Sequence, residues 1–143
     1  MFDCSSGERK LLAKPHGDSP LGRVSISQGG WLAAHLLRPD RVAALPSGKP
    51  WQVAPDADLA YVARGMSMYC GYFQLFKDDT GGLYWQTTVE VSSDPSRIGG
   101  IEERKVILQQ EGGKQYMILE PKQDMLLDDG TKTRAILKWE KFE

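Results

Sequence analysis

Few residues of this chain could carry out acid–base chemistry, and one of them stands in a strongly patterned stretch. Residues 31–37 (WLAAHLL) alternate as a β-strand does, because successive side chains of a strand point to opposite faces. One expected face holds Trp31, Ala33, His35 and Leu37. Histidine exchanges a proton near neutral pH, so we expect His35 to act as a general acid or base. The alternative is a histidine that hydrogen-bonds a neighbouring strand for packing.

Two further residues could stabilise a developing negative charge. Arg104 shares an expected strand face with Val106, and an inward-facing arginine can bind a carboxylate, phenolate or enolate through its planar donor fork. The alternative is an ion pair at the end of the strand, with Glu102 beside it. Tyr72 is the second candidate, as a phenol that steadies oxyanion charge.

Glu90 allows two interpretations that depend on which face of residues 83–91 is buried. It shares a face with Tyr84, whereas Trp85 lies on the opposite, more apolar face. If the apolar face is interior, Glu90 is solvated; if Tyr84 points inward, Glu90 is a buried carboxylate with a raised pKa and a candidate base. The residues expected to bind a ligand are Trp31, Ala33, Leu37, Phe73, Trp85, Thr87, Glu90 and Trp139.

The elements that position these residues begin with a hairpin. Residues 21–27 and 31–37 flank Gln-Gly-Gly, and glycine supplies the positive φ that tight hairpin turns need. The charged turn 38–41 follows, where a proline stops the strand ladder. A loop is expected over 41–55. Apolar residues then recur at helical spacing, which predicts one helix over 56–69.

Strands are expected over most of the remaining chain. Alternating runs separated by Gly-rich turns predict about seven strands in all; those after the helix cover 70–76, 83–91, 101–109, 114–120 and 132–142. Regular antiparallel strands joined by tight turns are typical of an up-and-down barrel or a sandwich, and we favour an all-β barrel. At 143 residues, the chain is expected to form a single domain, 1–143.

Composition excludes several functional classes. The net charge of −1 gives no electrostatic footprint for nucleic acid or an anionic membrane. No apolar run approaches the ~20 residues of a membrane span. Cys4 and Cys70 have neither metal-site spacing nor a disulfide-framework count, and no glycine pair forms a phosphate loop. We therefore expect a soluble cytoplasmic protein without a cofactor or metal; a homodimer stays open.

The order of these segments resembles the lipocalin-like domain family of fungi and bacteria. The resemblance rests on LGRVSISQGGWLAAHLLRPDR (21–41), YCGYF (69–73), VEVSSDP (89–95) and LKW (137–139). It implies a small calycin-type barrel of about eight strands with one helix after the third. The family usually opens with a Gly-Thr-Trp strand, and this chain begins inside that strand. Where the family often has a histidine pair, this chain has Thr87 and Thr88, so no role is transferred there.

These observations lead to one function hypothesis and two rivals. The first is a cofactor-independent isomerase, cyclase or lyase that acts on a hydrophobic polyketide- or terpenoid-type intermediate of secondary metabolism. In it His35 shuttles a proton, Arg104 or Tyr72 stabilises the oxyanion, and aromatic residues fold the substrate. The second is a non-catalytic carrier of a lipophilic ligand. The third is a structural barrel whose interior is filled by side chains.

Overall fold

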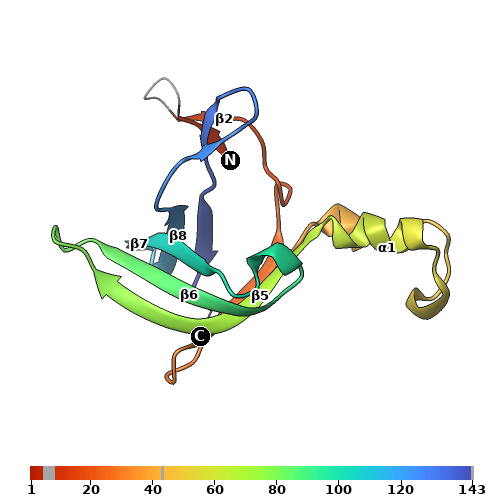
Figure 1. Ribbon diagram of the computed structural model, residues 1–143, viewed down its shortest axis with the longest axis horizontal. Helices are drawn as coiled ribbons and strands as arrows, with labels where there is room; N and C mark the ends of the chain where they lie inside the picture. The colour runs from red at the N-terminus through yellow and green to blue at the C-terminus, as the bar shows by residue number, and fades with distance from the viewer. Residues whose placement is uncertain (5–8, 43, 143) are drawn as a thin grey trace. The chain divides into compact units, whose positions relative to one another are not determined.

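The computed structural model describes residues 1–4, 9–42 and 44–142. Within them, strands predominate and one α-helix occurs (Figure 1). The strands are β1 (Phe2–Asp3), β2 (Lys10–Leu11), β3 (Leu21–Ile26), β4 (Trp31–Leu37), β5 (Met66–Lys77), β6 (Leu83–Ser92), β7 (Ile101–Glu111), β8 (Lys114–Pro121), β9 (Met125–Leu126), β10 (Lys132–Arg134) and β11 (Leu137–Glu140). The helix is α1 (Asp56–Ala63), and 3-10 turns are η1 (Pro39–Arg41), η2 (Trp51–Val53) and η3 (Pro95–Arg97). The predicted all-β antiparallel fold class is confirmed.

The strands hydrogen-bond into two sheets. The larger has the order β11-β8-β7-β6-β5-β4-β3, and the smaller has the order β2-β1-β10-β9. Consecutive strands from β3 to β8 are neighbours, including β4 and β5, which are joined by the long segment that contains α1. By contacts, the chain divides into two compact units. Unit 1 comprises residues 1–13, 74–86 and 102–143; unit 2 comprises residues 14–73 and 87–101.

Unit 2 contains the hairpin that the sequence predicts. β3 and β4 pair antiparallel from Leu21↔Leu37 to Ile26↔Leu32. Gly30 closes the turn with φ of +79°, a conformation that residues with a Cβ rarely adopt. β4 then pairs with β5 from Trp31↔Tyr72 to Leu37↔Met66. The predicted hairpin is therefore present, and it continues into a third strand.

Helix α1 is shorter than expected. It begins after Pro55, and Asp56 and Asp58 lie in its first turn, where carboxylates suit the unpaired N–H groups. It ends before Gly65, and residues 66–69, expected to be helical, belong to β5. The reason is tertiary: seven residues of β5 find registered partners on β4, and that ladder outweighs a local helical period. Figure 1 shows α1 leading directly into the start of β5.

Unit 1 contains the smaller sheet and the C-terminal strands. β8 pairs with β7 and also with β11, from Leu137↔Leu119 to Glu140↔Tyr116. In the smaller sheet, β1 pairs with β2 and with β10, and Phe2 lies opposite Arg134. The expected strand over 132–142 is thus two strands, β10 and β11, in different sheets. Alternation continues along the sequence, so periodicity does not reveal the change of partner.

Candidate functional site

Strand β4 buries the face opposite to the one expected. Leu32, Ala34 and Leu36 are 0%, 3% and 6% exposed, whereas His35 is exposed. The other members of the His35 face, Trp31, Ala33 and Leu37, are half-buried. Apart from His35, both faces of β4 are apolar, so alternation fixes which residues share a face and not which face is covered. His35 therefore lies on the more open face.

Tyr72 lies on the same face as His35. Trp31 is opposite Tyr72 in the β4–β5 register, and the two rings meet edge to face with centroids 5.3 Å apart and an interplanar angle of 87°. Tyr72 is 58% exposed. Phe73 points to the other face as the next residue along β5, and it is half-buried. Unit 2 thus places five predicted site residues on one strand face: Trp31, Ala33, His35, Leu37 and Tyr72.

Strand β6 resolves the two interpretations of Glu90. Trp85, Thr87 and Val89 are 1%, 0% and 1% exposed, and Glu90 on the opposite face is exposed. The apolar face is therefore the covered one, and the carboxylate of Glu90 is solvated. Thr87 is the polar member of the covered face. Within the described part of the chain, its Oγ1 atom has no hydrogen-bond partner.

Arg104 and Trp139 belong to unit 1, whereas His35 and Tyr72 belong to unit 2. The Nη2 atom of Arg104 lies 2.6 Å from Oε2 of Glu102, and its Nη1 donates to the backbone oxygen of Glu103 at 2.8 Å. Arg104 therefore forms the ion pair that the sequence offered as its alternative role. Trp139 is half-buried, and among the described residues its Nε1 atom has no acceptor.

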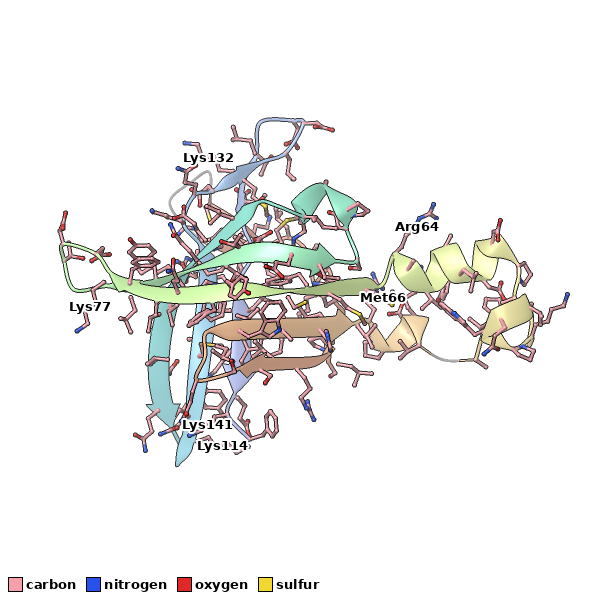
Figure 2. All side chains as sticks on the ribbon, turned by 60° about the horizontal axis from the view of Figure 1, so that its bottom comes forward. Arg64, Met66, Lys77, Lys114, Lys132 and Lys141 are labelled. Carbon is pink, nitrogen blue, oxygen red and sulfur yellow. The ribbon has the colours of Figure 1, made fainter. Side chains whose placement is uncertain are left out.

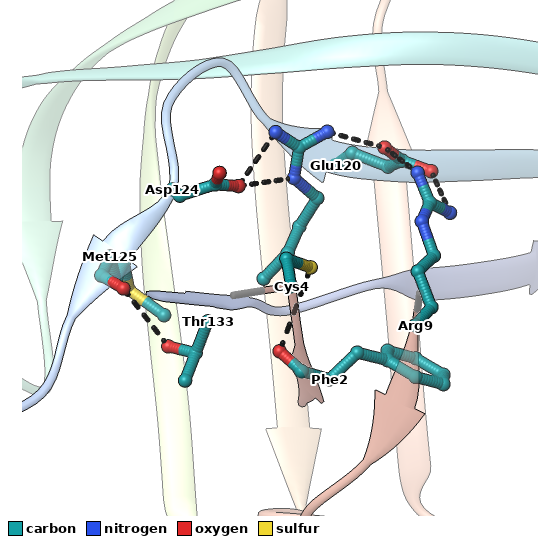
Figure 3. Close-up of polar contacts among 8 residues, drawn as sticks. Phe2, Cys4, Arg9, Glu120, Asp124, Met125 and Thr133 are labelled. Atoms are coloured by element: carbon teal, nitrogen blue, oxygen red, sulfur yellow. Dashed lines mark hydrogen bonds and ion pairs between the residues drawn. The ribbon is translucent and has the colours of Figure 1, made fainter. Parts of the chain in front are cut away.

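A buried carboxylate network in unit 1 was not predicted. Glu120 is 4% exposed and accepts hydrogen bonds from both terminal nitrogens of Arg9, each 3.1 Å long (Figure 3). Arg134 reaches the same carboxylate at 3.3 Å and also donates through Nε to Asp124 at 2.7 Å. The signal in the sequence is a lone charge within the apolar run YMILEP (116–121). The network joins β8 and β10 to the segment that contains Arg9.

Unit 1 also contains a pocket of about 430 Å³ beside the loop between β5 and β6. The lining includes Lys77 at the end of β5, Asp78 in the loop, Tyr84 on β6, Lys105 on β7 and Lys122 just after β8. Leu83, Asp79, Pro121 and Arg134 complete the lining. The pocket is therefore a mixed surface of cations, carboxylates and apolar side chains.

Two carboxylates at this pocket have lowered pKa values with identifiable causes. Hydrogen bonds from Thr80, followed by the backbone N–H of Gly82, hold the pKa of Asp78 below its ordinary value. A 2.7 Å hydrogen bond from Gln86 and a contact with Lys122 do the same for the pKa of Glu103, next to the pocket. Both groups are charged at neutral pH.

The sequence profile of the lipocalin-like domain matches residues 2–142. This chain belongs to the lipocalin-like domain family. No curated protein and no solved structure matches it. The resemblance stated from the hairpin and the later strands is thereby confirmed, and a lipocalin-like fold is one that suits the binding of a small molecule.

Within the described ranges, no three His, Cys, Asp or Glu side chains gather as a metal site would require. The described helix is also too short and too polar to cross a bilayer. The described residues offer three surfaces that could carry a function: the covered apolar face with Thr87, the open His35 face and the charged pocket.

Proposed function

We propose that this lipocalin-like protein binds a lipophilic small molecule that carries at least one hydrogen-bonding group. The observation that carries the proposal is the hydroxyl of Thr87, which is fully buried and has no hydrogen-bond partner within the described residues. A buried hydroxyl without a partner costs roughly 1–3 kcal/mol, so such groups are retained where something satisfies them. A polar group of a bound ligand would do so.

The surroundings of Thr87 support an apolar ligand. Trp85 and Val89 flank it on the same face of β6, and both are almost fully buried. Ligand pockets in proteins are mostly apolar with a small number of polar groups that orient the ligand. A single hydroxyl between a tryptophan and a valine has this composition, and it fits the fold of the family.

The experiment is the substitution Thr87→Val, which removes the hydroxyl and nearly preserves the volume. The probe is N-phenyl-1-naphthylamine, a neutral lipophilic fluorophore with one N–H donor. We expect Thr87→Val to weaken binding about fivefold and to raise the free energy of unfolding by up to about 1 kcal/mol. Thr88→Val, at the neighbouring exposed position, is the matched control and should leave probe affinity unchanged. Equal probe affinity in wild type and Thr87→Val would overturn the proposal.

A second candidate function is the cofactor-independent isomerisation or cyclisation of a polyketide- or terpenoid-type intermediate. It is supported by the strand face that His35 shares with the Trp31–Tyr72 ring pair, which places an imidazole and a phenol on one face of β4 and β5. Binding is the better-supported function for two reasons. Bulk water screens the charges that exposed acid–base groups would stabilise, and Arg104 already forms an ion pair with Glu102. Product analysis of wild type, His35→Ala and Tyr72→Phe tests it: equal turnover in all three would remove the acid–base role.

We also infer a cytoplasmic location. Cys4 and Cys70 are both free thiols, and free cysteines suit a reducing compartment. Fractionation of cells that produce the natural protein, followed by immunodetection, tests this location; recovery from an extracellular fraction would contradict it.

A further inference from the structure

The pocket beside the β5–β6 loop has features of a site for an organic anion. Its cations come from four different segments of unit 1: Lys77, Lys105, Lys122 and Arg134. Against them, two carboxylates line the pocket, Asp78 and Asp79. A concave surface lined by cations concentrates positive potential, because field lines focus in clefts.

Most carboxylates in and around the pocket are already satisfied by the protein. Oδ1 of Asp78 accepts three hydrogen bonds from its own loop, two from Thr80 and one from Gly82, between 2.7 and 2.9 Å. Glu103 accepts from Gln86 and Lys122. The Glu120 and Asp124 carboxylates are held by Arg9 and Arg134, as described above.

Two of the four cations have no such partner. Within the described ranges, the side-chain ammonium groups of Lys77 and Lys105 make neither a hydrogen bond nor an ion pair, and both residues are exposed. Lys105 lies near enough to Asp78 to lower the pKa of that carboxyl, but as the least of its causes. Lys77 is the last residue of β5, and Figure 2 labels it where the strand enters the loop. The pocket therefore keeps two ammonium groups available to a ligand.

The pocket also has an apolar wall. The ring of Tyr84 stacks on Phe76 with centroids 5.1 Å apart and planes inclined by 16°. Lys122 lies over the same Tyr84 ring, with Nζ 4.9 Å from its centroid. Leu83 and Pro121 add aliphatic surface. A purely inorganic anion would leave this surface uncovered, whereas a flat or apolar body would bury it.

We propose that this pocket binds an organic anion, a sulfonate or carboxylate attached to an aromatic body, with the anion at Lys77 and Lys105 and the body against Tyr84. The site uses other residues than the proposed function does, since Tyr84 and Thr87 point to opposite faces of strand β6. Lysines suit this role because an ammonium is a compact point charge with three donors that it can turn toward an anion.

The experiment compares two probes that differ by one sulfonate. 8-Anilinonaphthalene-1-sulfonate carries the anion, and N-phenyl-1-naphthylamine is the same ring system without it. In 20 mM buffer, we expect the double variant Lys77→Gln/Lys105→Gln to bind the sulfonated probe about tenfold more weakly and the neutral probe within twofold of wild type. Raising the NaCl concentration to 0.5 M should weaken binding of the sulfonated probe to wild type, and it should weaken binding to the variant much less.

The control variant is Lys49→Gln/Lys141→Gln, which makes the same change in net charge at two exposed lysines outside the pocket. It should bind both probes as wild type does. An equal loss in both double variants would mean that overall charge governs binding, and no loss in Lys77→Gln/Lys105→Gln would mean that the pocket takes no anion; either result overturns the proposal. Sodium sulfate and NaCl are also compared as competitors at equal ionic strength. If sodium sulfate displaces more of the sulfonated probe than NaCl does, an inorganic anion is sufficient, and the requirement for an aromatic body is overturned.

The two proposals fail separately. Thr87→Val should weaken binding of the neutral probe. The loss of affinity for the sulfonated probe caused by Lys77→Gln/Lys105→Gln should be the same with or without Thr87→Val. If Thr87→Val leaves the affinity for the neutral probe unchanged, the proposed function is refuted. The anion site is then still tested separately by the lysine variants.

Discussion

Arg9 and Glu120 are joined by two parallel hydrogen bonds of 3.1 Å, although 111 residues separate them in the chain. The carboxylate side of this pair is buried, with 6% of the Glu120 side chain exposed, and the arginine side is half exposed. We expect Glu120→Gln to lower the free energy of unfolding by about 2–4 kcal/mol, because it leaves Arg9 and Arg134 facing a neutral amide. Urea denaturation measures this change.

Glu140→Gln provides the comparison for this substitution. Glu140 pairs with Lys114 at 2.9 Å, and both side chains are about half exposed. An exposed pair contributes little to stability, so its loss should fall within the error of denaturation measurements. Equal effects of the two substitutions would show that burial does not set the strength of the Glu120 network.

Gly71→Ala should destabilise unit 2. A Cβ on Gly71 would collide with the backbone carbonyl of Thr88, which cannot move without disturbing β6. Overpacking of this kind costs about 1–3 kcal/mol or more. Gly29→Ala is the control, since a Cβ on Gly29 would make only an ordinary van der Waals contact, 3.8 Å from Ser27 Oγ. Thermal denaturation of both variants tests the difference, and a Gly71→Ala protein as stable as Gly29→Ala would contradict it.

His16 should make stability depend on pH. Burial, and secondly the positive charge of Arg38, hold the pKa of His16 below its ordinary value of 6.5. The unfolded chain therefore binds this proton more readily, so the stability that neutral His16 contributes is present above pH 6.5 and is lost as the pH falls through the folded-state pKa. Between pH 7.5 and 5, wild type should lose more stability than His16→Gln. Parallel pH profiles for the two proteins would refute this assignment.

Asp78 should hold the loop between β5 and β6. Its Oδ1 atom accepts from Thr80 and Gly82, and these bonds hold the pKa of Asp78 below its ordinary value of 3.8. The stability it contributes is present above pH 3.8 and is lost as the pH falls through the lower folded-state pKa. Asp78→Ala should speed amide hydrogen exchange in residues 77–83, and Asp78→Asn, which keeps one acceptor, should do so less. Unchanged exchange in both variants would exclude this role.

The hairpin of β3 and β4 could be predicted from the sequence because its determinants are local. A glycine turn and two alternating runs fix the register that pairs Leu21 with Leu37. The family could be predicted for a related reason, since the ordered motifs span most of the chain and the family profile covers residues 2–142. Both predictions rest on patterns that need no knowledge of which surfaces meet.

The predictions that differ from the structure depend on tertiary contacts. Met66 and Tyr69 fit a helical period, yet they pair with Leu37 and Ala34 in the sheet. Alternation placed His35 correctly beside Trp31 on one face, but the covered face of β4 is the other one. Glu120 was missed because its arginine partners come from distant segments, and spacing in the sequence carries no record of them.

The pairing of Phe2 with Arg134 sets an order of events during synthesis. A ribosome that extends the chain from its N-terminus makes β1 long before its neighbour β10 exists, so β1 must stay unpaired on that side while β3 to β8 form their local ladders. The smaller sheet then closes late, and its closure brings together residues more than 120 positions apart, a separation that slows folding. A peptide tag fused ahead of Phe2 would therefore slow closure of the smaller sheet more than a tag fused at the C-terminal end would.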